Sequence, residues 1–254
     1  MEALREIIQS FDPITLQEMD NVKLMDRRDT KYAFRQDELC VFLSQLRDSY
    51  RILEVDNHRL INYESLYFDT NNFELYNHHH CGRFNRYKIR YRKYVQSGLS
   101  FFEIKFKSNK GRTIKKRIRQ NDIYEVIDNE AKIFFEKHCT INPQSLEAKM
   151  YIGFNRITLV NRNSPERVTI DLNLTFKNGS QKKEVQNLVI AEVKQDKSSR
   201  SEFIRLMKHF HIREGTISKY CLGISHLFTQ LKNNNFKPQL IKFNKILYGT
   251  ASGY

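Results

Sequence analysis

The sequence predicts an α+β fold in which eight antiparallel strands close into a barrel and helices pack on its outside. Two observations lead to this class: short segments in which polar and apolar residues alternate, and amphipathic segments of helical period between them. A third observation is that charged residues recur two apart on the polar faces, as in Arg90/Arg92 and Glu192/Lys194. A polar interior under an apolar, helix-covered outer face is typical of a closed barrel.

Alternation with period two marks eight principal strands. In the segment 84–94, Arg90 and Arg92 lie on one face and Tyr87, Ile89 and Tyr91 on the other. The seven other segments follow the same rule and span residues 29–34, 57–69, 99–108, 112–119, 150–160, 167–176 and 187–195. A further short strand at 51–55 is expected to pair with the next strand through the Asp56-Asn57 turn.

Apolar residues three and four apart predict helices over residues 36–48, 122–138, 201–210 and 216–228. A helical turn at 73–76 is expected to lead into an exposed loop with three consecutive histidines. The chain shows neither an internal repeat nor a linker-like stretch. Residues 1–230 are therefore predicted to form a single domain, and residues 231–254 a C-terminal tail.

The positive charge of the chain is concentrated in one region. The formal net charge is +14, and the segment 83–119 holds fourteen Lys or Arg residues and one acid, Glu103. Such an excess usually indicates a polyanionic partner. Nucleic acid is disfavoured, because Tyr87 and Tyr91 lie opposite the cations, whereas nucleic-acid-binding sheets mix stacking aromatics with cations on one face.

The charged faces of the strands could point either towards water or into the interior of a barrel. For any single strand, a charged face turned towards water is the simpler interpretation. However, three consecutive strands within 84–119 each carry a stripe of cations. Inside a barrel these cations would repel one another unless a polyanion or a metal lay between them. The whole pattern therefore favours a bore that receives a chain of phosphates.

Several classes of protein are excluded or disfavoured by the sequence. No G-x-x-x-x-G-K-[ST] segment is present, which argues against a P-loop kinase or ATPase. No apolar stretch approaches the roughly 20 residues of a membrane span, and Glu2, Arg5 and Glu6 do not fit a signal peptide. The four cysteines are far apart and suggest no disulfide framework. A soluble, cytoplasmic protein is expected.

Seven short motifs occur in order along the chain. They are Asp29-Thr30-Lys31-Tyr32, Tyr67-Phe68-Asp69-Thr70, Asn85-Arg86-Tyr87-Lys88-Ile89-Arg90-Tyr91-Arg92, Phe102-Glu103-Ile104-Lys105, Arg167-Val168-Thr169-Ile170-Asp171, Glu192-Val193-Lys194 and Ser218-Lys219-Tyr220. This ordered set resembles a VTC domain, the catalytic domain of the vacuolar transporter chaperone complex, within the triphosphate tunnel metalloenzyme superfamily. The similarity runs from about Met25 to Leu227.

The resemblance implies an eight-stranded tunnel that moves the γ-phosphate of ATP onto a growing polyphosphate chain with the help of Mn²⁺ or Mg²⁺. It implies catalytic contacts with phosphate for Lys31, Arg90, Arg92, Lys105, Arg156 and Arg167. It implies substrate-phosphate binding by Lys115, Lys194 and Lys219, and metal binding by Glu192, with Glu103 as a second candidate. The residue types suit these roles, since Arg clamps phosphate oxygens in pairs and Lys acts as a mobile point charge.

Two further functions remain open at this point. The first is an inorganic or nucleoside triphosphatase of the same fold. The second is a non-catalytic module that binds polyphosphate or a nucleotide and regulates a membrane-protein partner supplied in trans. Thr216 stands three residues before Lys219, where the eukaryotic polymerases that the chain resembles would have a second basic residue. The oligomeric state also remains open.

Overall fold

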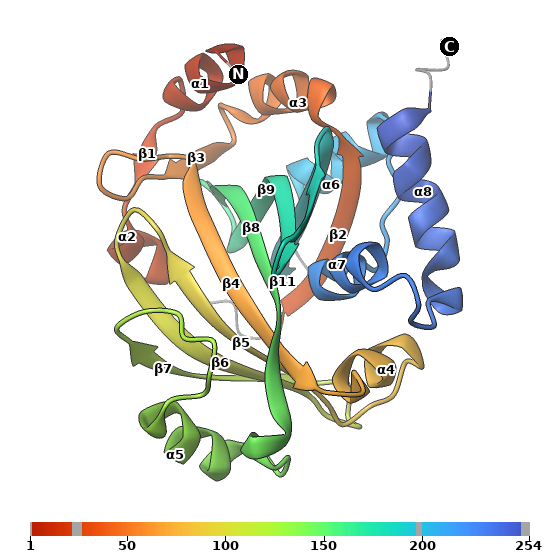
Figure 1. Cartoon of the computed structure of the whole chain (residues 1–254). Helices are drawn as coiled ribbons and strands as arrows, with labels where there is room; N and C mark the ends of the chain where they lie inside the picture. The colour runs from red at the N-terminus through yellow and green to blue at the C-terminus, as the bar shows by residue number, and fades with distance from the viewer. Residues whose placement is uncertain (1, 22–26, 197–199, 250–254) are drawn as a thin grey trace.

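The computed structural model describes residues 2–21, 27–196 and 200–249, which fold around one strongly curved sheet (Figure 1). Eight strands follow one another through antiparallel pairing in the order β2-β11-β9-β8-β4-β5-β6-β7. In chain order they are β2 (Arg27–Arg35), β4 (Ile61–Thr70), β5 (Arg86–Tyr94), β6 (Leu99–Lys107), β7 (Thr113–Gln120), β8 (Leu146–Asn161), β9 (Glu166–Asn178) and β11 (Leu188–Asp196). They correspond to the eight predicted principal strands, and the α+β class is confirmed.

The predicted closure of the barrel is not confirmed. Within the described residues, the order of strands ends at β2 on one side and at β7 on the other, and these two strands are not paired. The chain segment before the seventh α-helix lies against the free edge of β2, where the Gly215 amide donates to the Lys31 carbonyl oxygen at 2.9 Å. A closing strand would need this carbonyl group, so the sheet remains open between β7 and β2.

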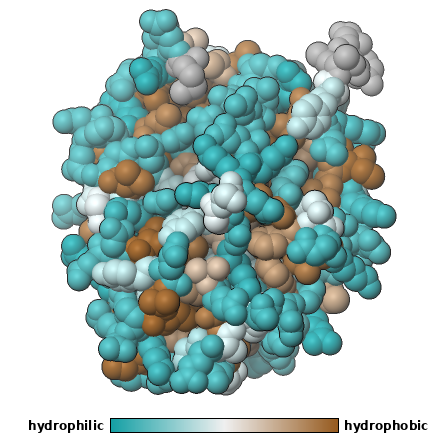
Figure 2. Space-filling model, in the orientation of Figure 1, coloured by the Kyte–Doolittle hydropathy of each residue, from teal (hydrophilic) through white to brown (hydrophobic). Residues whose placement is uncertain are grey.

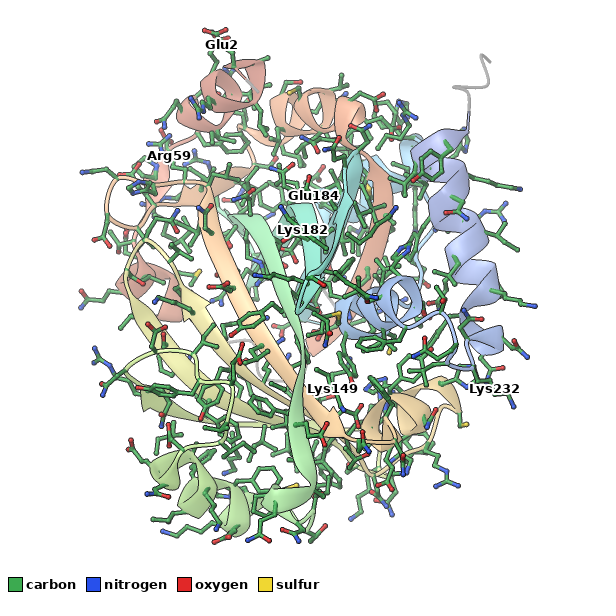
Figure 3. The ribbon with its side chains drawn as sticks, in the orientation of Figure 1. Glu2, Arg59, Lys149, Lys182, Glu184 and Lys232 are labelled. Carbon is green, nitrogen blue, oxygen red and sulfur yellow. The ribbon has the colours of Figure 1, made fainter. Side chains whose placement is uncertain are left out.

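Three short strands complete the sheet. β1 (Pro13–Ile14) pairs in parallel with β3 (Tyr50–Leu53), and β3 pairs with β8 rather than with the strand that follows it. The predicted pairing of 51–55 is therefore wrong, although an isolated bridge from Val55 to His58 spans the expected turn. β10 (Gln181–Val185) forms a hairpin with β9, and its Lys182 and Glu184 pair at 2.6 Å (Figure 3).

Helices cover the outer, apolar face of the sheet. The first group is α1 (Glu2–Gln9), α3 (Leu39–Leu46) and α6 (Glu202–His209), which pack on β2, β11, β9 and β8. On the other half, α5 (Asn129–His138) packs on β4, β5 and β6. These two layers lie at opposite ends of the molecule in Figure 1. The alternation predicted from the sequence therefore directs the apolar side chains outward and the charged ones towards the inside of the curve.

A β-bulge in β9 divides the inner face into two zones. The alternation expected to run unbroken through 167–176 is interrupted at Asn173, whose φ is 55° and where the register with β8 shifts. Before the bulge, Thr169 and Asp171 face inward; after it, Leu174 and Phe176 do so and join an apolar cluster. Asn adopts this left-handed backbone conformation more readily than most residues, which explains its position at the bulge.

The apolar zone of the inner face is covered by α7 (Lys219–Leu227), with α4 (Glu74–His80) and α8 (Lys237–Tyr248) in the same cluster. Gly223 of α7 lies so close to the sheet that a Cβ atom there would come within 2.5 Å of Met150 and Phe176. The helix thus occupies one end of the curved sheet. The charged zone forms the remainder of the inner face.

Several helices differ from the sequence-based expectation. The helix predicted over 122–138 begins only at residue 129, and the three histidines lie within α4, where His80 is buried. The segment expected to be a tail contains α8, whose Phe243 is buried against α7 and the sheet. The remaining helical elements are α2 (Leu16–Asn21) and three short turns of 3₁₀-helix, Gln36–Glu38, Pro143–Ser145 and Asn234–Phe236.

Polar residues cover most of the surface seen in Figure 2, where apolar residues form separate small patches. None of the described helices has the length and apolar character needed to cross a membrane.

Candidate functional site

The charged zone collects the predicted cations from seven strands and one helix. We call it the cationic zone; its cations are Lys31 (β2), Arg90 and Arg92 (β5), Lys105 (β6), Lys115 (β7), Arg156 (β8), Arg167 (β9), Lys194 (β11) and Lys219 (α7). Register links neighbours, since Arg167 lies opposite Lys194 and Lys105 opposite Lys115. Residues on distant strands also interact electrostatically, as Lys105 of β6 does with Glu192 of β11. The curvature therefore brings both ends of the sheet to one site.

Glu103 organises one half of the cationic zone. Its carboxylate is 0% exposed and accepts two hydrogen bonds from Arg90, at 2.6 and 2.8 Å, while its other oxygen pairs with Lys115. Burial disfavours its charge, but Arg90, Arg92 and Lys115 outweigh burial and hold the pKa of Glu103 well below its ordinary value. Arg90 also donates to the Tyr67 hydroxyl at 2.6 Å. The guanidinium is thus fixed from two sides.

Asp171 organises the other half, and the sequence analysis gave it no role. It accepts hydrogen bonds from Arg156 at 2.5 and 2.7 Å and forms an ion pair with Lys219. Although burial opposes ionisation, these two cations lower the pKa of Asp171 to about 2. The only sequence signal was its place on the charged face of its motif. One buried carboxylate therefore fixes a strand arginine and a helix lysine together.

Glu192 lies between two lysines on the β2 side of the zone. Its carboxylate is 2.5 Å from Lys194 and 4.0 Å from Lys31, and its side chain is 24% exposed. Burial acts against the charge, but Lys194 and Lys31 keep the pKa of Glu192 well below its ordinary value. The carboxylate is thus ionised and accessible.

The cations of the zone exceed the negative charge available to them. Burial, together with Arg90 and Arg92, lowers the pKa of Lys105 well below its ordinary value. Burial is also the main cause of the lowered pKa values of Arg92, Lys88, Lys115, Lys194 and Lys219. Lys88, on the same face as Arg90, was missed as a site residue although the alternation placed it there. An anion bound in this zone would stabilise the charged form of each group.

The side chains of the zone provide one carboxylate suited to a divalent cation. Among the residues that the structure describes, no three His, Cys, Asp or Glu side chains form a ready metal site. Mg²⁺ is commonly held by one or two carboxylates, with water and substrate phosphate as the remaining ligands. Glu192 fits this pattern because its ionised carboxylate is partly exposed. Both carboxylates are ion-paired, but Glu103 fits this pattern less well because its side chain is 0% exposed, whereas that of Glu192 is 24% exposed.

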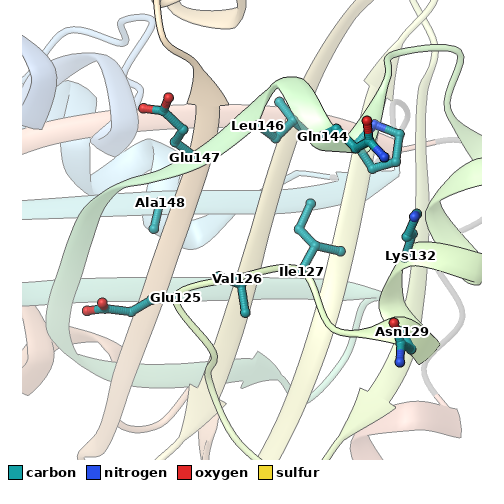
Figure 4. Close-up of a pocket in the computed structure, with 10 residues that line it drawn as sticks. Glu125, Val126, Ile127, Asn129, Lys132, Gln144, Leu146, Glu147 and Ala148 are labelled. Atoms are coloured by element: carbon teal, nitrogen blue, oxygen red, sulfur yellow. The ribbon is translucent and has the colours of Figure 1, made fainter.

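A separate surface pocket lies on the outer side of the sheet. Figure 4 shows it between the loop before α5 and the start of β8, with Val126, Ile127 and Leu146 among its lining residues. None of the predicted site residues lines it. The site is thus defined by the cationic zone and not by this pocket.

Comparison with known proteins bears on this arrangement. The family model of the VTC domain matches residues 26–228, which include every predicted site residue. The chain belongs to the VTC domain family. The match begins just before β2 and ends at the end of α7, so this VTC domain includes the whole cationic zone. No curated protein matched the chain.

Solved structures that match the chain share little sequence with this VTC domain. A candidate adenylate cyclase from Bacillus halodurans is 13% identical, with a TM-score of 0.49, over 80% of this chain and 100% of that one. A candidate adenylate cyclase from Vibrio parahaemolyticus is 13% identical, with a TM-score of 0.47, over 78% and 99%. A candidate adenylyl cyclase from Hippeastrum, described with a dominant triphosphatase activity, is 15% identical, with a TM-score of 0.44, over 80% and 96%.

Proposed function

We propose that the chain is a metal-dependent phosphotransferase that binds the triphosphate of ATP in the cationic zone and moves its γ-phosphate onto a polyphosphate chain. One observation carries the proposal: cations from seven strands and α7 converge on a zone whose carboxylates Glu103, Asp171 and Glu192 are already ion-paired. The cations of the zone outnumber these three carboxylates, and a bound polyanion would balance the excess. Membership of the VTC domain family supports the same reaction class.

The residues of the zone divide into groups that contact phosphate and groups that hold them. Arg90 and Arg156 present guanidinium groups fixed by Glu103 and Asp171, which reduces the entropy lost when they bind phosphate. Lys31, Lys105 and Lys194 add mobile charges; Arg92, Lys115, Arg167 and Lys219 complete the set. Glu192 would hold the Mn²⁺ or Mg²⁺ ion, which when bound neutralises charge on the phosphate oxygens.

The proposed transfer needs no protein nucleophile. A terminal phosphate oxygen of the polyphosphate chain attacks the γ-phosphorus, the bond from that phosphorus to the bridging oxygen breaks, and ADP leaves with the electron pair. The attacking oxygen is already ionised, so no general base is required. Alignment of the two phosphates and neutralisation of their charge account for most of the lowering of the barrier in such reactions. The fixed arginines are suited to both tasks.

The proposal is tested by incubating the purified protein with ATP and Mn²⁺ or Mg²⁺. Products are analysed by gel electrophoresis for chains and by assays for ADP and free phosphate. Chains with matching ADP are the expected result. Free phosphate without chains would replace the proposal with a triphosphatase, and neither product, with binding retained, would replace it with a non-catalytic binding module. Arg90→Met, which removes a fixed guanidinium of the cationic zone, is expected to lower chain formation strongly. Lys177→Met, which changes an exposed lysine outside the cationic zone, is the control and is expected to leave chain formation unchanged.

A further inference from the structure

Asp69, in the second sequence motif, is a buried acid without an assigned role. It lies at the end of β4 and is 0% exposed. Four donors surround its carboxylate: the amides of Thr70 and Leu75, both at 2.8 Å, the amide of Tyr76 at 2.9 Å and the Tyr220 hydroxyl at 2.5 Å. Such a fully satisfied buried carboxylate fixes the position of every group that donates to it.

Two of these hydrogen bonds, from the amides of Leu75 and Tyr76, attach Asp69 to the start of α4. The residue before this helix, Phe73, has a φ of 56° and provides no side-chain cap. The amides of Leu75 and Tyr76 lie in the first turn, where helix geometry leaves N–H groups without backbone acceptors. Asp69 accepts both, so its carboxylate is rigidly held. Its Oδ2 atom also accepts a hydrogen bond from the hydroxyl group of Tyr220, which belongs to α7.

The first residues of α7 contact three different strands. Ser218, the N-cap, accepts a hydrogen bond from Lys88 of β5 at 3.1 Å. Lys219 pairs with Asp171 of β9, and Tyr220 donates to Asp69 of β4. Lys88 and Lys219 belong to the inner charged face. The orientation of α7 therefore decides where two phosphate-facing groups lie.

Apolar packing alone does not fix that orientation. The contacts of Gly223 with the sheet set the distance of α7 from it, but such contacts have no preferred direction. The Tyr220 ring stacks on Tyr67, with centroids 5.0 Å apart, and this arrangement tolerates sliding. The hydroxyl bond to Asp69 is directional. Burial and the charge of Asp69 raise the pKa of Tyr220 well above its ordinary value, so the hydroxyl remains a donor.

We propose that Asp69 is a positioning residue for phosphate recognition: through Tyr220 it fixes the start of α7 so that Lys219 lies in the cationic zone beside Asp171. The inference rests on the proposed function, because it assumes that Lys219 contacts substrate phosphate. It extends that function by assigning a role to a residue that contacts no phosphate itself. The acid acts on recognition through two intervening groups, the Tyr220 hydroxyl and the first turn of α7.

The test measures binding of inorganic tripolyphosphate to the full chain by calorimetry. Tyr220→Phe removes the hydroxyl and keeps the stacked ring, and it is expected to weaken binding about tenfold, as is Lys219→Met. The double variant is expected to bind more tightly than the sum of the two single losses predicts, because the hydroxyl acts in large part through that lysine. A purely structural hydroxyl would not give this non-additivity.

Tyr50→Phe is the matched control. Tyr50 is also fully buried and donates its hydroxyl to a buried carboxylate, Glu166, but it lies in the outer core under α6. It is expected to lower the melting temperature as Tyr220→Phe does, with tripolyphosphate affinity unchanged. If Tyr220→Phe does not fold, Asp69→Asn replaces it; the side-chain volume is retained, and the same loss of affinity is expected.

The outcomes separate the two proposals. A wild-type protein that does not bind tripolyphosphate overturns the proposed function and this inference together. A wild-type protein that binds, with Tyr220→Phe binding equally well, overturns the inference alone. The inference alone is also overturned if the losses of binding free energy in Tyr220→Phe and Lys219→Met are fully additive in the double variant.

Discussion

The two zones of the inner face belong to the same sheet but have opposite linings. In β9, Asp171 faces inward among cations, and three residues later Leu174 faces inward among apolar side chains and α7. A one-residue bulge at Asn173 separates them. The comparison teaches that the site is bounded by a backbone irregularity: the charged lining stops where the register changes, and the helix that carries Lys219 packs on the apolar lining beyond it.

The largest expected effect comes from placing a charge in the wrong zone. Leu174→Asp introduces a carboxylate at a position that is 0% exposed and lies in an apolar cluster, and it should lower the free energy of unfolding by at least about 4 kcal/mol. Urea denaturation measures this. Ser65→Asp is the control, since it is equally buried but lies 3.1 Å from the Arg92 guanidinium, and less than about half of that loss is expected. Equal losses would show that the zones do not differ.

The second effect concerns turnover. Glu192→Gln removes the accessible carboxylate of the cationic zone, and metal-dependent phosphate transfer should fall on the order of 100-fold. Tripolyphosphate binding without metal should be retained or strengthened, because one negative charge leaves the zone. Steady-state assays and calorimetry give the two quantities separately. A parallel loss of both would mean that Glu192 maintains the structure of the zone instead of holding a metal.

The third effect is a pH dependence. Lys105 and Lys219 have lowered pKa values in the free protein, and a bound polyphosphate favours their protonated forms. Binding therefore takes up protons, and the affinity should fall as pH rises above the free-state pKa, by at most about tenfold per pH unit for each lysine. Calorimetry in two buffers of different ionisation enthalpy measures the uptake. Lys105→Arg should reduce it; an affinity independent of pH would contradict the assignment.

The smallest effect is expected at the edge of the cationic zone. Lys115 of β7 has a side chain that is 36% exposed, whereas Arg92 is buried on the same face. Solvent screens exposed charges, so Lys115→Met should weaken tripolyphosphate binding only about threefold, and Arg92→Met considerably more. Titrations at equal ionic strength compare the two. A larger loss of affinity for Lys115→Met than for Arg92→Met would contradict this prediction and indicate that the phosphates bind closer to β7.

The charged stripes were predictable because they follow from a local rule. Period-two alternation is enough to place Arg90, Arg92 and Lys105 on one face, and the recurrence of cationic stripes on three consecutive strands favoured an inward direction for that face. The bulge was not predictable, because polar and apolar residues still alternate in the sequence on both sides of Asn173. Asp171 was missed as a site residue because an acid on a charged strand face looks the same whether it meets solvent or two cations.

Features that depend on distant contacts were also missed. Closure of a barrel is decided by what lies at its last two edges, and no local pattern reveals that Gly215 binds the edge of β2. The helix α8 has Pro238 at its start, a favourable position, but its apolar stripe becomes clear only where Phe243 meets α7. The packing of Phe243 in the apolar cluster, and not the sequence pattern, distinguishes this helix from a solvent-exposed C-terminal tail.

The last strand of the sheet, β7, has a further consequence. Because the order of strands ends there, one side of its backbone has no neighbouring strand in the described structure. A row of unpaired amide and carbonyl groups can form hydrogen bonds with a strand of a second chain, and such pairing leads to aggregation. Lys115, Lys116 and Arg117 repel an identical strand that approaches this margin. The same charges that attract a polyanion thus keep separate molecules apart.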